Sequence, residues 1–469
     1  MPQVLFEKIP FTKERFFNGY LALVNEEDRH VLLESGRAGK YSIAAIRPFA
    51  VIESDWDKTE VVQDGERTVY RGRPLSVLEE WMKPFIINPI PGLPDFQGGA
   101  VGYISYDYAQ YIESLPNLAE DDLNFPIMYF MAFDEWAVFD HEEECLWIMV
   151  LDQGDRRMAE EKLAKGKAAW LNAQTFESMM ADEPFPDGRE SLDVSFTEEE
   201  FVKAVKRVQE YISEGDVFQV NLTVRQSRKL SVPALDVYRE LRSLNPSPYM
   251  GYLHTPEFQI VSGSPELLVK KDGTTVSTRP IAGTRPRGID DADDMRLANE
   301  LIDNEKEQAE HIMLVDLERN DMGKVCEYGT VKVDELMTVE KYSHVMHIVS
   351  NVTGTLAADK SSCELVEAMF PGGTITGAPK VRTLEIIEEL EPVKRGVYTG
   401  SLGWIGFNED LHMNIVIRTM LVKEGMCHVQ AGAGIVIDSD PEAEYKESLK
   451  KAAALWKAKE AAENRKVPK

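Results

Sequence analysis

Short apolar runs separated by turn residues fill the first part of the chain, to about residue 180, and this pattern predicts a domain with many β-strands. The predicted strands are Val31–Ser35, Val51–Ser54, Thr59–Val62, a glycine-rich segment at 96–107, Ala132–Asp140 and Cys145–Val150. Two longer periodic stretches, Leu75–Phe85 and Arg156–Leu171, predict helices.

The composition changes to Asp, Glu, Pro, Gly and Ser between residues 179 and 194, which predicts a linker. A helix start follows, because Thr197 with Glu200 three residues later forms a capping box. Gly215 is expected to end this helix. We therefore predict two domains, at residues 1–185 and 195–460.

The second domain alternates apolar runs of strand length with longer helical patterns. The predicted strands lie at 219–224, 259–262, 266–270, 331–333, 345–352, 401–406, 413–422 and 426–432, and the predicted helices at 293–317, at 381–390 and at the C-terminus.

Two glycine-bearing segments, one from each half of the chain, match at identical spacing. Gly99-x-x-Gly102-Tyr-Ile-x-Tyr-Asp resembles Gly400-x-x-Gly403-Trp-Ile-x-Phe-Asn. Each half is thus expected to contribute an equivalent strand to a common core. This favours an α+β fold of two packed, largely antiparallel sheets over a doubly wound parallel sheet.

Composition and charge narrow the function classes. The chain has 469 residues and a formal net charge of −28, which argues against nucleic acid or an anionic membrane as the partner. The four cysteines form no C-x-x-C pair, so zinc and redox motifs are not expected. No signal pattern or membrane-length apolar run is present, which predicts a cytoplasmic protein.

The loop at 371–382 contains three glycines, two prolines and no acid, in a chain that is otherwise acidic. Glycines let the backbone approach a ligand, and a helix start that follows would attract an anion. We predict a loop that leads into a helix, with Lys380 and Arg382 in the first turn. A tight connection between packed elements explains the same pattern, so this alternative stays open.

Several polar residues occur where apolar periodicity does not require them. Glu307, Glu310 and His311 share one helix face, which fits either a solvated surface or the oxygen ligation of Mg²⁺. Arg418 follows an apolar run and suits the binding of a carboxylate, although an edge residue in contact with solvent would look alike. The histidines at 344 and 347 are expected to be structural.

Together these motifs resemble the chorismate-binding enzymes, over roughly residues 195–455. The motifs are Gly-Ser-Pro-Glu at 263–266, Pro-Ile-Ala-Gly-Thr-Arg at 280–285, Ala-Glu-His at 309–311, Leu-Val-Asp-Leu-Glu-Arg-Asn-Asp at 314–321, the loop at 371–380, and the pair Glu447-x-x-x-Lys451.

The resemblance implies a role for each matching residue. Glu266 would be the general acid, Glu310 and Glu447 would bind Mg²⁺, and His347 would lie beside the reacting ring. The remaining substrate contacts would be Tyr398 and Arg418 at the enolpyruvyl carboxylate with the amides of Gly432 and Gly434 nearby, and Thr284, Thr374 and Lys451 at the ring carboxylate.

Two positions bear on the nucleophile. Family members that activate water carry a lysine where this chain has Gln219, so the resemblance implies ammonia instead. Many enzymes that aminate C4 of chorismate carry a nucleophilic lysine at the position of Ala282. Anthranilate synthases carry an alanine there, as this chain does. The residues at 371–376, 398–404 and 414–418 resemble those of aminodeoxychorismate synthases more than those of anthranilate synthases. C4 amination is therefore predicted, with anthranilate formation as the alternative.

Ammonia would come from a separate glutamine amidotransferase, because no cysteine lies in a glutaminase nucleophile motif. A tryptophan pocket is also implied, with Glu34 and Ser35 on one edge and Pro248, Tyr249 and Met250 on the other; an ordinary contact between domains is the alternative. Isochorismate formation and a catalytically silent binding module are the further hypotheses.

Overall fold

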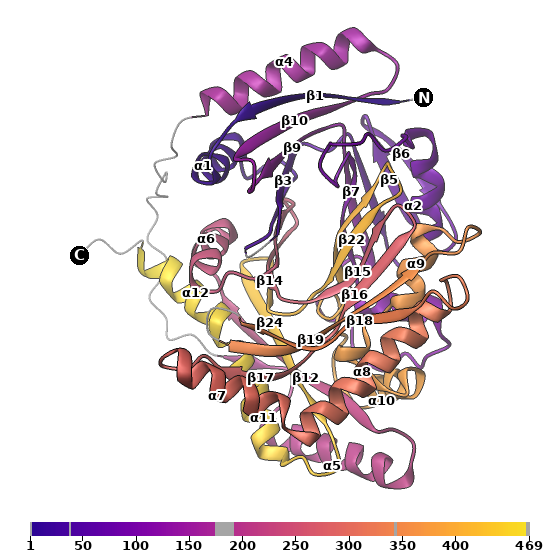
Figure 1. Cartoon of the computed structure of the whole chain (residues 1–469), viewed down its shortest axis with the longest axis vertical. Coiled ribbons are helices and arrows are strands. Elements are labelled where there is room, and N and C mark those ends of the chain that lie inside the picture. Colours follow the sequence, from indigo (N-terminus) through magenta and orange to yellow (C-terminus); the bar gives the residue numbers. More distant parts are fainter. Residues whose placement is uncertain (1, 37–38, 174–191, 342–344, 466–469) are drawn as a thin grey trace.

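Two large antiparallel sheets form the centre of the computed structural model, which describes residues 2–36, 39–173, 192–341 and 345–465 (Figure 1). In spatial order the first sheet contains β1 (Gln3–Pro10), β10 (Cys145–Asp152), β9 (Glu135–Asp140), β3 (Tyr41–Ile46), β2 (His30–Glu34), β13 (Tyr249–His254), β14 (Phe258–Ser264), β23 (Thr419–Lys423), β24 (Met426–Ile435), β12 (Gln219–Lys229) and β11 (Asp193–Val194), and β20 (Gly377–Ala378) also pairs with β12.

The second sheet has the same number of strands. Its order is β17 (Ile281–Pro286), β19 (Val345–Thr355), β16 (Thr275–Arg279), β15 (Leu267–Asp272), β22 (Leu411–Ile415), β21 (Ser401–Gly406), β7 (Gly99–Ile104), β8 (Met128–Phe133), β4 (Ala50–Ser54), β5 (Thr59–Gln63) and β6 (Glu66–Tyr70), and β18 (Lys332–Lys341) also pairs with β19. The predicted fold class is confirmed.

Helices cover the outer faces of both sheets (Figure 1). Those packed on the first sheet are α1 (Lys13–Leu23), α4 (Arg156–Asn172), α5 (Glu198–Glu214), α6 (Ala234–Leu244), α10 (Lys380–Leu390), α11 (Pro441–Lys451) and α12 (Ala453–Arg465). The others are α2 (Pro74–Met82), α3 (Ala109–Ile112), α7 (Asp291–Ile302), α8 (Glu305–Gly323) and α9 (Ser362–Met369), with short 3₁₀ turns at Lys83–Phe85, Tyr106–Tyr108 and Gly373–Ile375. Among the described residues, no helix is long and apolar enough to span a membrane.

The two matching glycine segments lie side by side in the second sheet. β7 and β21 are antiparallel neighbours, and Gly102 lies opposite Gly403. The neighbouring backbone leaves no room for a larger residue, because a Cβ atom on Gly102 would lie 1.9 Å from the carbonyl oxygen of Tyr129. The expectation that each half contributes an equivalent strand to a common core is confirmed.

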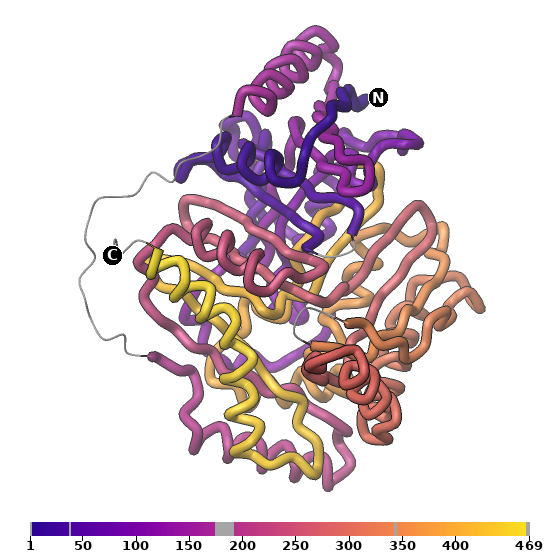
Figure 2. Tube along the Cα trace, turned by 60° about the vertical axis from the view of Figure 1, so that its left-hand side comes forward, coloured from indigo at the N-terminus to yellow at the C-terminus, as the bar shows by residue number. Residues whose placement is uncertain are grey.

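Both halves of the chain contribute strands to both sheets. In the first sheet β2 pairs with β13, and in the second β7 pairs with β21. Figure 2 shows the same interleaving, with the N-terminal segments in indigo and magenta and the C-terminal segments in orange and yellow. The predicted linker lies almost wholly outside the described residues, and the division at 185–195 stays a prediction.

The Thr197–Glu200 capping box and the left-handed Gly215 are both present, as predicted. Three long predicted elements are each broken in two. The strand predicted at 132–140 is divided into β8 and β9 at Asp134, and the helix at 293–317 into α7 and α8 at residues 303–304. A new N-cap causes the helix break, because the Asn304 side chain accepts a hydrogen bond from the amide of Glu307 at 3.1 Å.

The third break is at Arg418. The strand predicted at 413–422 is divided into β22 and β23, which belong to different sheets. Arg418 has a φ angle of 51°, so the backbone turns there from one sheet into the other. This turn places the arginine between the sheets rather than on a strand face.

Candidate active site

Glu266 is a buried carboxylic acid between β14 and β15, with an exposed fraction of 4%. Its amide donates to the Ser264 hydroxyl at 3.3 Å, and the amide of Ile281 faces its Oε1 at 3.5 Å. Burial raises the pKa of Glu266 to about 7, and the Thr374 hydroxyl and the Ile281 amide lower it only in part. The group can therefore hold a proton near neutral pH.

The Thr374 hydroxyl is itself buried. It lies close enough to Glu266 to lower the pKa of that carboxyl, yet it makes no full hydrogen bond within the described part of the chain. A buried hydroxyl without a partner is costly, so a polar group of a ligand would complete it.

The loop at 371–382 is attached to β12 through β20. Gln219 lies opposite Ala378, and the amide of Asn221 donates to the carbonyl of Thr376 at 2.8 Å. A Cβ atom on Gly377 would lie 2.1 Å from the carbonyl oxygen of Gln219, and its φ angle is 128°. The predicted helix follows as α10, which begins at Lys380.

Gln219 connects this loop to α8. Its Nε2 donates to Oε1 of Glu310 at 3.1 Å, and a Cβ atom on Gly434 would lie 2.2 Å from the same Nε2. Burial raises the pKa of Glu310, the Gln219 amide lowers it, and Glu307 raises it. A cation would relieve this unfavourable burial of negative charge.

Lys451 and Glu447 lie near the end of α11. The Lys451 ammonium donates to the carbonyl of Gly432 and forms an ion pair with Glu447, each at 3.0 Å. Lys451 also lowers the pKa of Glu310. Glu447 is about half exposed, at 55% of its side chain, and is open to a ligand.

Two further carboxylates lie beside the predicted ligands: Glu444, which was not singled out from the sequence, and Glu307, which was placed on the helix face of Glu310. Burial raises the pKa of Glu444, and the charge of Glu447 raises it further. Glu307 acts in the same direction on Glu310. Both pairs have i, i+3 spacing on a helix, which is the sequence signal that identifies Glu444 as a neighbour of the site.

The guanidinium of Arg418 forms no ion pair with an acidic side chain among the described residues. Burial lowers its pKa, and the nearby Tyr398 raises it. Tyr398 is buried, which raises the pKa of its hydroxyl. A partly buried arginine without an acidic partner favours an anion, and the planar guanidinium fits a carboxylate.

His347 lies within the electrostatic reach of Arg418. Its Nδ1 donates to the carbonyl of Gly283 at 2.9 Å and lies 3.1 Å from the Thr284 hydroxyl. Burial lowers the pKa of His347, the hydrogen bond to Gly283 raises it in part and Arg418 lowers it, so the net lowering favours the neutral ring. The other predicted histidine, His344, lies outside the described residues.

β17 connects the acid to this histidine. Ile281 faces Glu266, Gly283 binds His347, and Ala282 lies buried between them. The predicted site residues thus form three groups: Glu266 with Thr374 and Ala282; His347 with Thr284, Arg418 and Tyr398; and Gln219 with Glu310, Gly432, Gly434, Glu447 and Lys451.

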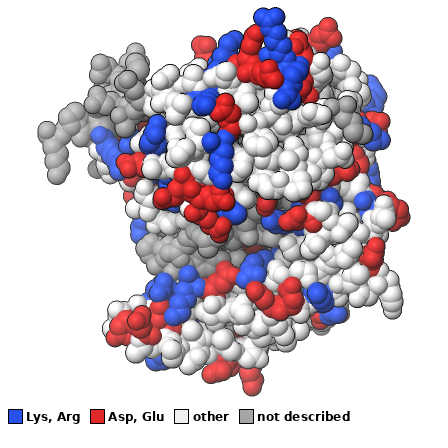
Figure 3. Space-filling view, turned by 45° about the horizontal axis from the view of Figure 1, so that its top comes forward, with Lys and Arg blue, Asp and Glu red and all other residues white. Residues whose placement is uncertain are grey.

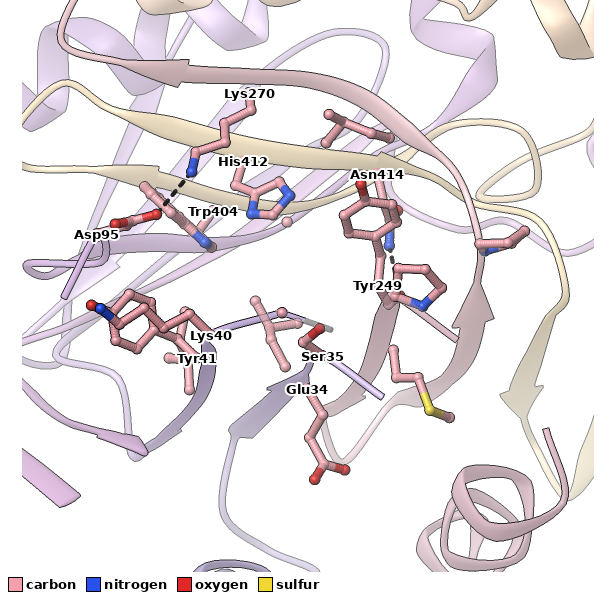
Figure 4. A pocket seen from close by; sticks show the side chains of 18 of the residues that line it. Glu34, Ser35, Lys40, Tyr41, Asp95, Tyr249, Lys270, Trp404, His412 and Asn414 are labelled. Carbon is pink, nitrogen blue, oxygen red and sulfur yellow. Dashed lines mark hydrogen bonds and ion pairs between the residues drawn. The ribbon is translucent and has the colours of Figure 1, made fainter. Parts of the chain in front are cut away.

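A cavity of about 680 Å³ lies between β2, β13 and the second sheet (Figure 4), and Ile281, whose amide faces Glu266, is part of its wall. Glu34, Ser35, Pro248, Tyr249 and Met250, the five predicted pocket residues, all line it. The sequence did not indicate its other walls, which include Trp404, His412 and the Lys270–Asp95 ion pair at 2.9 Å.

Glu34 is fixed at the edge of this cavity. Its carboxylate accepts hydrogen bonds from Arg242 at 2.7 and 2.9 Å and from the Tyr238 hydroxyl at 2.9 Å, both on α6. In Figure 4 the Glu34 carboxylate points away from Trp404 and His412. The side chain therefore anchors the wall rather than offering a free charge to the interior.

Comparison with known proteins decides the family. The model of the chorismate-binding enzyme family matches residues 28–457. The chain belongs to the chorismate-binding enzymes. It is 52% identical to aminodeoxychorismate synthase component 1 of Bacillus subtilis, over 97% of each chain, and 44% identical to anthranilate synthase component 1 of Thermus thermophilus, over 95% of each.

A solved structure shows the same architecture. The fold matches anthranilate synthase component I from Streptococcus pneumoniae with a TM-score of 0.79 and 33% sequence identity, over 89% of this chain and 92% of that one. This chorismate-binding enzyme carries acidic and basic side chains interspersed over the face in Figure 3, without a basic surface.

Glu310 and Glu447 are the two carboxylates at which a magnesium ion is expected. Glu310 is partly buried and its pKa is raised. Glu447 is exposed to solvent and forms an ion pair with Lys451. Within the described ranges, the only three-ligand cluster is Asp140, Glu143 and Cys145, far along the chain from these residues. An open set of two carboxylates suits Mg²⁺, which keeps water and substrate oxygens as ligands.

Proposed function

We propose that this chorismate-binding enzyme aminates chorismate at C4 with ammonia from a separate glutamine amidotransferase, giving 4-amino-4-deoxychorismate. The carrying observation is the buried Glu266, whose pKa of about 7 suits a general acid. The 52% identity to aminodeoxychorismate synthase component 1, against 44% to an anthranilate synthase component 1, supports the C4 product.

Substrate binding would depend on the positive groups. The Arg418 guanidinium, which has no acidic partner among the residues described, would take the enolpyruvyl carboxylate together with the Tyr398 hydroxyl. Lys451, Thr284 and Thr374 would orient the ring carboxylate. Mg²⁺ held by Glu310 and Glu447 would neutralise the charge of that carboxylate.

The C4 hydroxyl of chorismate is a poor leaving group, so the chemical step needs an acid that protonates it. Protonated Glu266 would donate to the C4 hydroxyl, the C–O bond would break, and water would leave. Ammonia would form the new C–N bond and pass one proton to the Glu266 carboxylate, which returns to its protonated form. His347 is neutral and held by Gly283, so it would lie against the ring without adding charge.

Gln219 argues for ammonia over water. Its side chain is an amide that donates to Glu310 at 3.1 Å, and an amide cannot act as a base toward water. Ala282 offers no nucleophile on β17, so ammonia would attack the ring directly. Formation of anthranilate stays the second candidate, because Ala282 is also the residue that anthranilate synthases carry.

The partner and the regulatory ligand belong to this proposal. The word "component" in the names of the two relatives supports a separate ammonia-producing subunit. The cavity lined by Ser35 and Met250 would hold tryptophan, against Trp404 and His412. A cytoplasmic setting is consistent with a biosynthetic enzyme of this kind.

The test measures chorismate loss with an ammonium salt and with Mg²⁺. Wild-type protein should consume chorismate only when both are present. Glu310→Gln should lower kcat/KM by about 100-fold or more, since removal of a group that only supports a metal ligand already costs about 10- to 100-fold. Glu305→Gln, an exposed carboxylate on the same helix, is the matched control and should change it less than about twofold. Turnover without ammonium would contradict the proposal.

A further inference from the structure

The loop at 371–382 touches the C-terminal half of α8 at two places that the proposed reaction does not use. One contact joins Gly373 to Glu318, and the other joins Lys380 to Asp321. The residues between these contacts include Thr374, which lies beside the acid Glu266.

Glu318 is the first anchor. It is 3% exposed, and its Oε2 accepts a hydrogen bond from the Thr278 hydroxyl at 3.3 Å. The amide of Gly373 lies close enough to this carboxyl to lower its pKa, although burial raises that pKa more. The loop lies so close to α8 that a Cβ atom on Gly373 would be 2.3 Å from Cδ2 of Leu317 and 3.6 Å from Oε1 of Glu318.

The ion pair of Lys380 with Asp321 is the second anchor. The two side chains are 10% and 2% exposed, and the ammonium also reaches the carbonyl of Met369 at 3.4 Å. Asp321 has a second partner, Lys324, at 2.9 Å, but that side chain is 49% exposed and lies directly after α8, at its C-cap. A buried ion pair fixes geometry more firmly than an exposed one.

α8 places these anchors and a proposed metal ligand in one rigid element. Glu310, Leu314, Glu318 and Asp321 follow each other at spacings of four, four and three residues, which is one face of a helix. Leu314, Glu318 and Asp321 are buried along this face. A shift of the loop on α8 would therefore move Thr374 relative to Glu310 as well as to Glu266.

We propose that Glu318 and Asp321 are positioning residues. They hold Gly373 and Lys380, on either side of Thr374, so that the Thr374 hydroxyl stays beside Glu266. The effect on turnover rests on the proposed function, whereas the anchoring of the loop does not.

The first experiment measures amide hydrogen exchange of residues 372–378 without substrate. In Lys380→Met these amides should exchange about tenfold faster than in wild type, because the loop loses one of its two anchors. The matched control is Lys324→Met, which removes the exposed partner of the same Asp321 and should leave the exchange unchanged. Equal exchange in both variants would overturn the proposal, whatever reaction the enzyme catalyses.

A second variant covers the case in which Lys380→Met does not fold. Asp321→Asn keeps the shape of the side chain and removes its charge, so it should also accelerate exchange at 372–378. Lys380→Arg retains a cation and should restore slow exchange. Unchanged protection in folded Asp321→Asn would contradict the assigned role.

The second experiment is a double-mutant cycle on the pH profile of kcat/KM. Thr374→Val removes a hydroxyl that lowers the pKa of Glu266, so the alkaline limb should move to higher pH. Lys380→Met should move the limb in the same direction, and the double variant should add no further shift, because both changes remove one interaction. If the two shifts of the alkaline limb add in the double variant, or if the limb of Lys380→Met lies at the same pH as that of the wild type, Lys380 does not act through Thr374.

Discussion

Glu266 can hold a proton near neutral pH because it is buried between β14 and β15, and no cation among the described residues shifts its pKa. Its neighbours are the Thr374 hydroxyl and the Ile281 amide, which lower the pKa less than burial raises it. The resulting value of about 7 is well above the usual range of a glutamic acid. The environment therefore suits donation of a proton.

A pH profile tests this assignment. The acid must be protonated, so kcat/KM should be highest below pH 7 and fall as pH rises through the pKa of about 7. Glu266→Gln should lower kcat by about 10² to 10⁴ and abolish this limb, with little change in the KM for chorismate. Glu257→Gln, on an exposed residue, is the control. A limb unchanged in position in Glu266→Gln would assign the titration to another group.

Some of these residues could be predicted from the sequence and others could not. Glu266 and Arg418 stand in short motifs, so each was predicted from its local sequence. The contact of Gln219 with Glu310 joins positions 91 residues apart, and no local pattern encodes it. The proposed role of Glu318 was not predicted either, because the sequence does not distinguish a buried glutamate on a helix from a solvent-exposed one.

At the scale of elements, the glycine-bearing strands β7 and β21 bring the two halves of the chain together at backbone distance. The repeated spacing predicted this pairing, because the same residue types serve both strands. The breaks at Asn304 and Arg418 were not predicted, because neither site carries a glycine or proline. The N-cap at Asn304 has a sequence signal, Glu307 three residues later, which the prediction overlooked. The positive φ angle at Arg418 becomes visible only in the folded backbone.

Substitution of Gly102 tests how tightly these strands pack. Gly102→Ala should destabilise the protein by about 1–3 kcal/mol, since its methyl group would meet the Tyr129 carbonyl. The control is Gly166→Ala in α4, where the nearest atom is Cγ2 of Ile148 at 3.4 Å. That change should stabilise by up to about 1 kcal/mol, the helix preference of alanine over glycine. Chemical denaturation checks both values, and equal stability of the two variants would contradict the packing.

At the scale of the whole molecule, both sheets combine strands from the two halves of the chain. The sequence predicted two antiparallel sheets but not their strand order, because pairings such as β2 with β13 join residues more than 200 positions apart. The cavity depends on this assembly, since Ser35 and Met250 come from different halves and Trp404 from the second sheet. Its edges were predicted from motifs, while its interior required the three-dimensional structure.

The position of the new C–N bond tests the central claim most directly. Wild-type protein is incubated with chorismate, Mg²⁺ and ¹⁵N-labelled ammonium, and the product is identified by NMR and mass spectrometry. We predict 4-amino-4-deoxychorismate with the label on C4 and the enolpyruvyl group retained. Fluorescent anthranilate, with the label on C2 and release of pyruvate, would contradict this account.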